Sequence, residues 1–205
     1  MRSVRLFSRK NGKGNLLCGL SPAKRMGSVR EIVADYIARC RAGVELEMSF
    51  YGQRPSLKEA IRVGANAIRV DGKRHDHQRR IPAASLSELG RRLETEEPQI
   101  RSCQSFRHLH ELIKSTAMGI PKIGKLTVYD TAVRIGAKVG LAPQDVYLHA
   151  GTTKGVAAFR IDTSAEFIEP AELSCEFQKL KPFEIEDVLC IYKKDFHRLA
   201  QGGKL

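Results

Sequence analysis

The stretch from Arg69 to Arg80 carries the densest set of side chains suited to binding phosphate. It holds five cations, two histidines and a glutamine within twelve residues, after a turn at Asp71-Gly72. Arginine forks bind phosphate oxygens through paired hydrogen bonds, and backbone amides in a turn add further donors. A solvated charged loop without a ligand is the alternative. The side chains expected to contact a polyanion here are Lys73, Arg74, His75, His77, Gln78, Arg79 and Arg80.

Two His-x-His pairs, His75 with His77 and His108 with His110, raise the question of a metal site. Residues two apart share a face in an extended segment, whereas on a helix they diverge. An acid stands beside each pair, but the four groups would form a ligand set only if the pairs met in space. No cysteine spacing supports such a site. Because a histidine that donates to phosphate is the simpler interpretation, we predict no metal.

A second polar segment, from Asp145 to Gly155, resembles a phosphate- or substrate-binding loop. His149 precedes a Gly-Thr-Thr turn and Lys154 follows it. Glycine allows close backbone approach, and threonine hydroxyls add hydrogen-bond donors. The segment matches neither a P-loop nor a dinucleotide fingerprint, so we predict no cofactor. We expect His149 to assist chemistry, with a structural histidine as the alternative, and Thr152 and Lys154 to contact nucleic acid.

Residues 112–127 read as two helices joined by a Gly/Pro-containing turn over 119–124. Free amides at the start of the second helix, together with its dipole, favour a bound phosphate. The stretch resembles the helix-hairpin-helix motif of DNA-binding proteins, in which a Gly-hydrophobe-Gly turn contacts the phosphate backbone. It departs from the motif at Lys122, where a glycine is usual. The resemblance implies nucleic-acid contacts by Lys122, Gly124, Lys125 and Thr127.

The next residues, beginning Val128-Tyr129-Asp130-Thr131-Ala132, resemble the Val-Asp-Thr-His-x-x-Arg segment of helix-hairpin-helix DNA glycosylases. That resemblance implies that Asp130 is the carboxylate needed to break the base–sugar bond. Ala132 replaces the usual histidine, and Asp130 follows the hairpin more closely than in the family. The chemistry fits a base flipped out of the stack, with the carboxylate stabilising an oxocarbenium ion and Tyr129 stacking on the base. Arg134 joins the expected nucleic-acid contacts, and helix capping is the alternative for Asp130.

Helical periodicity dominates the elements that must position these residues. Ser28 with Glu31 and Ser56 with Glu59 are capping boxes at the starts of two helices. Residues 44–51 fit either a strand or a helix. The fold class is therefore mainly α, a compact multi-helix domain. The expected helices span 28–41, 56–68, a short segment capped by Ser85, 105–118, 126–139, 143–149, 170–177 and 184–199, with an acidic turn over 94–98 and a break at 151–153.

Positive charge is concentrated in the N-terminal half. Residues 1–110 hold 22 Lys and Arg against 11 Asp and Glu, whereas residues 111–205 hold 13 against 12. Such asymmetry attracts polyanions through counterion release. Residues 1–27 contain no acid and read as a basic, disordered arm ahead of a single domain over 28–205, with an organelle-targeting segment as the alternative.

The cysteines and the hydropathy pattern bear on the compartment. The chain has five widely spaced cysteines without a CxxC pair, which indicates reduced thiols and a cytoplasmic setting. No apolar run is long enough to span a membrane.

Together these features predict a nucleic-acid-binding protein, with DNA favoured over RNA, that acts as a glycosylase-like enzyme. A binding module without chemistry is the first alternative. The second is a small hydrolase of a phosphorylated metabolite, in which His75, His77 and His149 would converge.

Overall fold

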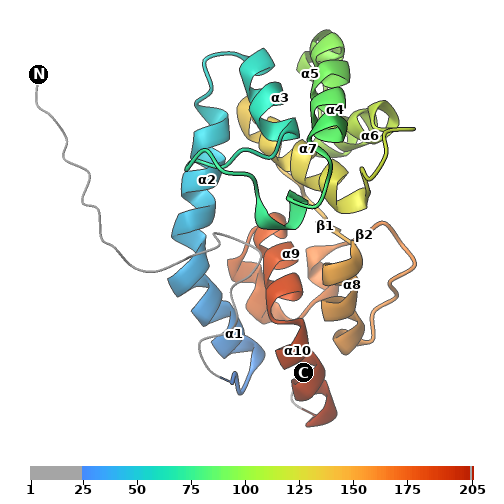
Figure 1. Cartoon of the computed structure of the whole chain (residues 1–205). Coiled ribbons are helices and arrows are strands. Elements are labelled where there is room, and N and C mark those ends of the chain that lie inside the picture. Colours follow the sequence, from blue (N-terminus) through green and yellow to red (C-terminus); the bar gives the residue numbers. More distant parts are fainter. Residues whose placement is uncertain (1–24, 204) are drawn as a thin grey trace, which may run out of the picture.

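The computed structural model describes residues 25–203 and 205, which are mainly helical, as predicted (Figure 1). Most of the predicted basic arm, residues 1–24, lies outside the described residues. Its end at residue 27 is wrong, because Met26 is buried and donates its amide to Asp195 Oδ1 at 3.4 Å. Met26 therefore belongs to the core, whereas Arg25 and Gly27 beside it are exposed. Within the described chain, no helix combines the length and apolar character needed to cross a bilayer.

One long helical rod forms a side of the molecule (Figure 1). It comprises α1 (Val29–Tyr36), a π-helical segment (Ile37–Arg41) and α2 (Ala42–Gly52). Ser28 caps α1 as predicted.

The rod continues through Gly43, where the sequence predicts an end. A mid-helix glycine costs about 1 kcal/mol relative to alanine. Burying Val44 and Tyr51 on the following turns contributes more, about 1.5 to 3 kcal/mol for a large apolar side chain. Packing thus decides that the ambiguous residues 44–51 are helical.

A middle lobe follows, with its own apolar core. Ser56 and Ser105 cap helices as predicted, whereas Ser85 lies inside a helix whose N-cap is Pro82. The predicted acidic turn over 94–98 is instead the junction between two helices. The elements of this lobe are α3 (Leu57–Ala65), a 3-10 turn (Asp76–Gln78), α4 (Ala83–Thr95), α5 (Glu97–Ser102), α6 (Phe106–Thr116) and α7 (Lys125–Val139).

The chain then returns to the rod and builds a terminal lobe with α1. Here the predictions fail most often. A strand lies within residues 143–149, where a helix was predicted, and a helix contains the predicted break at 151–153. The predicted helix over 170–177 is a pair of 3-10 turns, and the one over 184–199 divides into two helices. The elements are β1 (Val146–Tyr147), α8 (Ala150–Val156), a 3-10 turn (Ala157–Phe159), β2 (Phe167–Ile168), 3-10 turns (Pro170–Glu172 and Cys175–Lys179), α9 (Pro182–Ile191) and α10 (Lys193–Gln201).

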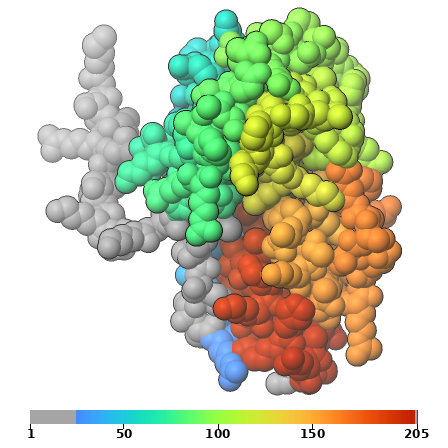
Figure 2. Space-filling view, turned by 45° about the vertical axis from the view of Figure 1, so that its right-hand side comes forward, coloured from blue at the N-terminus to red at the C-terminus, as the bar shows by residue number. Residues whose placement is uncertain are grey.

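The short antiparallel pair β1–β2 lies where the two lobes meet. Val146 pairs with Ile168 and Tyr147 with Phe167. Because successive strand residues face opposite sides, Val146 joins the core of the terminal lobe while Tyr147 joins that of the middle lobe. Figure 2 shows the green-to-yellow middle lobe meeting the orange-to-red terminal lobe across the molecule. The two lobes therefore meet at an interface that separates two apolar cores.

Candidate functional site

A cavity of about 80 Å³ lies at the interface between the lobes. We call it the interlobe cavity. Its walls come from α2, the loop that contains His75 and His77, α7, His149 and α9. Both lobes and the rod that joins them therefore contribute side chains. The lining residues are Val44, Glu47, Met48, Tyr51, His75, His77, Leu126, Tyr129, Asp130, Val133, Arg134, His149, Phe183, Glu186, Asp187 and Cys190.

One face of α7 forms a continuous wall of this cavity. Leu126, Tyr129, Asp130, Val133 and Arg134 follow the spacing of three and four residues that places side chains on one side of a helix. Asp130 lies in the second turn of a helix whose N-cap is Gly124, so it is not a capping residue. The helix carries it into the interface.

Asp130 is the most heavily hydrogen-bonded acid of the cavity. Its Oδ2 accepts from His77 Nε2 at 2.6 Å, Gln78 Nε2 at 3.0 Å and Arg134 Nη2 at 3.4 Å. All three donors bond to Oδ2, and none of them bonds to the second oxygen, Oδ1. Burial alone would raise the pKa of Asp130, but Arg134 and the hydrogen bond from His77 outweigh it and lower the pKa to about 2. The carboxylate is ionised at neutral pH.

Glu47 presents the opposite situation on the facing wall. Its side chain is 1% exposed, and both carboxylate oxygens lack a hydrogen-bond partner among the described residues. His75 Nε2 lies 3.4 Å from Oε1. The Tyr51 hydroxyl donates to the carbonyl of Ile68 at 2.8 Å and lies 3.0 Å from His75 Nε2. A buried carboxylate without donors is costly, which makes Glu47 a candidate ligand-binding group.

The third polar cluster of the cavity joins the start of α8 to α9. His149 is the N-cap residue of α8, and its Nε2 bonds to Glu186 Oε1. The hydroxyl of Thr152 donates to the same Glu186 oxygen at 3.1 Å. His149 and Glu186 are both buried. These hydrogen bonds join the start of α8 to α9 at the cavity wall.

The balance of charge in the cavity is acidic. Four carboxylates, of Glu47, Asp130, Glu186 and Asp187, line it with a single guanidinium, that of Arg134. Burial lowers the pKa of His75, so its imidazole is neutral near pH 7. His77 and His149 share the lining with these acids and bond to Asp130 and Glu186.

No known family model, characterised protein or solved structure matches this chain.

The hairpin that leads into α7 contains two residues in the left-handed conformation. Gly119 and Lys122 both have positive φ, 77° and 65°. Lys122 thus adopts the left-handed conformation that glycine takes without strain, at the position where the motif usually has glycine. Gly124 caps α7 without a side-chain hydrogen bond, which leaves the first amides of the helix available. Lys122 and Lys125 are exposed, and no ion pair of either is found among the described residues.

Several residues predicted to contact nucleic acid lie instead inside the protein. Arg134 is 4% exposed and donates to Gln78 Oε1 at 2.9 Å and to Asp130. Gln78 is 1% exposed, and Thr152 is fully buried with its hydroxyl on Glu186. Because these side chains are enclosed by protein contacts, they position the acids of the cavity rather than a phosphate. The other expected contacts that are buried are His75 and Thr127.

Tyr129 is also more enclosed than stacking on a base requires. Its side chain packs against Tyr147 and Phe106, with ring centroids 5.2 and 6.0 Å away, and its residue is 3% exposed. Burial raises the pKa of Tyr129 well above its usual value, so the hydroxyl stays protonated. Tyr129 is a wall of the cavity and part of the core.

The basic loop 69–80 divides between the cavity and the surface. His77 lines the cavity, while Arg79 pairs with Asp76 at 2.9 Å and Arg74 donates to the Ile81 carbonyl. Lys73, Arg80 and Lys154 are exposed away from the cavity lining. Many other arginines of the N-terminal half are also paired with nearby acids, such as Arg62 with Glu59. The sequence charge therefore overstates the free positive surface.

The sequence reasoning missed Glu47, Glu186 and Asp187. Glu47 carried a usable signal, because Val44, Glu47, Met48 and Tyr51 follow helical spacing, and an acid on an apolar helix face is unusual. Glu186 gave a weaker signal, because the apolar residues of its helix do not gather on one face. Its role becomes visible only where α9 meets the start of α8.

The depressed pKa of Asp130 predicts a loss of stability in acid. A carboxylate whose pKa is lower in the folded state than in the unfolded chain stabilises the fold above the unfolded pKa. That stability is lost as pH falls through the folded pKa. For Asp130 the window runs from 3.8 down to about 2, and the contribution is about 2 kcal/mol. We expect Asp130→Asn to flatten the fall in the free energy of unfolding as pH decreases from about 5 to about 2, measured with urea. Asp71→Asn, which changes an exposed acid of the loop 69–80, should leave the fall intact. An equal fall in both variants contradicts the assignment.

Proposed function

We propose that the protein binds DNA and hydrolyses the bond between a base and its sugar, with Asp130 as the catalytic carboxylate. The proposal rests on the position of Asp130. It is an ionised acid in an acidic cavity, on the same helix whose start forms the phosphate-suited hairpin. Five residues separate Lys125 from Asp130, a rise of about 7.5 Å along a helix.

Helix α7 would thus fix the spacing between a phosphate held at the hairpin and the reacting sugar. Cations at the hairpin attract the backbone, while the acidic cavity accepts the uncharged base and the sugar. This separation of charge suits a nucleotide better than a free phosphorylated metabolite. His75, His77 and His149 do line one cavity, as the metabolite hydrolase requires, but the four carboxylates beside them repel phosphate.

The acidic lining also fits the charge that develops during the reaction. As the carbon–nitrogen bond breaks, its electrons leave with the base and the sugar acquires oxocarbenium character. Water then adds its oxygen to the sugar carbon, and one of its protons ends on the base. A carboxylate with a pKa of about 2 is a weak base, so we assign Asp130 to stabilising the sugar cation rather than to removing a proton. Oδ1 is the oxygen that remains for this contact.

The interlobe cavity must open to admit a base. At about 80 Å³ it holds several waters, whereas typical ligand pockets hold roughly 300 to 1,000 Å³. Its walls belong to two lobes with separate cores. We therefore expect the lobes to separate as a flipped base enters and to close around it.

Reversal of the two hairpin charges tests the binding half of the proposal. Lys122→Glu with Lys125→Glu should weaken binding to a short DNA duplex by roughly tenfold to 100-fold at low salt, because two phosphate contacts are lost. The slope of log K against log salt should become less steep by about 2. Fluorescence anisotropy across a salt series measures both quantities.

The matched control reverses two exposed cations of the terminal lobe, Arg30→Glu with Lys194→Glu. Equal losses in both double variants would mean that net charge, and not the hairpin, governs binding. The same reactions can be assayed for abasic sites on duplexes that each carry one altered base. Binding without abasic sites on any duplex would leave only the non-enzymatic module.

A further inference from the structure

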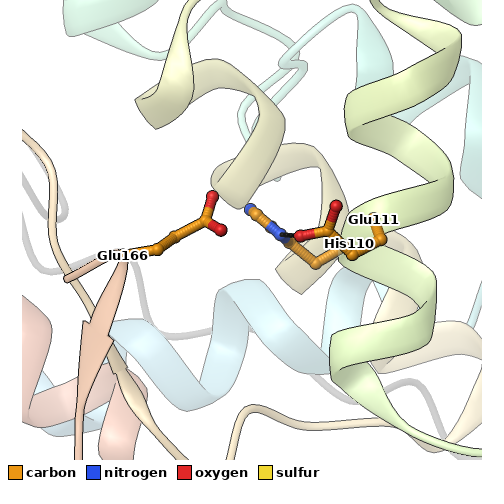
Figure 3. A group of neighbouring side chains, drawn as sticks. All are labelled: His110, Glu111 and Glu166. Carbon is orange, nitrogen blue, oxygen red and sulfur yellow. Dashed lines mark ion pairs between the residues drawn. The ribbon is translucent and has the colours of Figure 1, made fainter.

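A second polar cluster lies outside the interlobe cavity, in the groove that borders the hairpin. Its members are His110 and Glu111 of α6 and Glu166, which immediately precedes β2 (Figure 3). One ligand atom from each residue lies within 4.8 Å of the other two. The groove continues along Gly124 and Lys125 at the start of α7.

His110 is the observation that points to a ligand. Its side chain is 4% exposed, and its Nδ1 has no hydrogen-bond partner among the described residues. The same Nδ1 lies 3.7 Å from Glu111 Oε1, as the dashed line in Figure 3 marks. The ring packs against Tyr147, with centroids 4.6 Å apart, which fixes its direction.

Lys114 shows that the carboxylates of the cluster already converge on a cation. Its Nζ lies 2.9 Å from both oxygens of Glu166 and 3.2 Å from Glu111 Oε1. The lysine side chain is 45% exposed. It can swing into solvent at little cost, because exposed ion pairs contribute little to stability.

We propose that His110, Glu111 and Glu166 bind a divalent transition metal of the Zn²⁺ class, which displaces the Lys114 ammonium. Bonds of about 2.0 to 2.2 Å to a tetrahedral zinc place ligand atoms about 3.4 Å apart. The two glutamates are 53% and 30% exposed and reach that spacing by side-chain rotation. The imidazole favours zinc over magnesium, which prefers oxygen ligands alone. Three protein ligands leave a fourth position open to the groove.

Titration calorimetry of the full chain with Zn²⁺, without nucleic acid, tests this site independently of the proposed base chemistry. We expect one zinc ion to bind the wild type through the cluster. Glu166→Gln should weaken that binding by more than about 100-fold, since loss of even an outer-sphere partner costs about 10- to 100-fold. Lys114→Met should tighten it about fivefold to tenfold, because a competing cation is removed.

Glu45→Gln, an exposed acid on α2, is the matched control and should leave zinc affinity unchanged. Mg²⁺ in place of Zn²⁺ should bind weakly to all variants. Absence of zinc binding in both the wild type and Lys114→Met would overturn the site. Zinc affinity unchanged by Glu166→Gln would also overturn it, and equal affinity of Lys114→Met and wild type would overturn the displacement of the lysine.

Discussion

Asp130→Asn is expected to lower the rate of base release by about 100- to 1,000-fold while leaving DNA affinity nearly unchanged. Removing one preorganised group that stabilises developing charge has an effect of this size. Asparagine keeps the shape of the side chain and accepts a hydrogen bond, but it brings no negative charge to the sugar cation. Single-turnover release of the base, measured on the duplex that the wild type cleaves fastest, reports the chemical step.

The affinity of the same variant separates chemistry from binding. The hairpin amides, Lys122 and Lys125 lie outside the interlobe cavity, so the substitution leaves the proposed phosphate contacts in place. Asp71→Asn changes an exposed acid and should retain full activity. Base release by Asp130→Asn at a rate within about tenfold of the wild type would rule out Asp130 as the catalytic carboxylate.

The sequence predicts the helices best where capping and periodicity agree. Ser28, Ser56 and Ser105 accept the amide three residues ahead, and α7 ends at Gly140, whose φ is 77°. Local hydrogen bonds determine such helix ends, and neighbouring residues suffice to predict them. The fold class follows from the same signals.

The sequence fails where contacts distant along the chain decide the structure. Residues 146–147 form a strand because 167–168 pair with them, which local periodicity does not reveal. Gly151 lies inside α8, where an added Cβ would collide with Cys190 of α9. Here glycine permits close packing of two helices rather than breaking one.

The candidate site was predictable in part for a similar reason. The sequence identified Asp130, His77 and His149 as candidates for catalysis or binding, and the structure brings them to one cavity. Arg134 and Gln78 were expected to contact nucleic acid at a surface, because both are polar and the sequence does not show which side chains surround them. In the fold they bond to Asp130, and such partners become visible only when the loop lies over α7.

Glu47→Gln is expected to raise the stability of the protein and lower its activity together. Both Glu47 oxygens are buried without a hydrogen-bond partner among the described residues, so this polar side chain opposes folding. Replacing it with a neutral amide of the same shape should increase the free energy of unfolding by about 1 kcal/mol or more. Glu45→Gln, two residues earlier and exposed, should change neither quantity.

The loss of activity follows from what the Glu47 carboxylate offers a base in the proposed function. The two carboxyl oxygens match adjacent N–H groups on the edge of a base, and hydrogen bonds of this kind contribute about 1 to 3 kcal/mol. We therefore expect Glu47→Gln to reduce base release by roughly 10- to 100-fold on a base with such donors and much less on one without them. Urea unfolding and single-turnover release on the two duplexes measure the opposing effects. A variant that is both less stable and equally impaired on both bases would mean that Glu47 supports the fold instead of contacting the base.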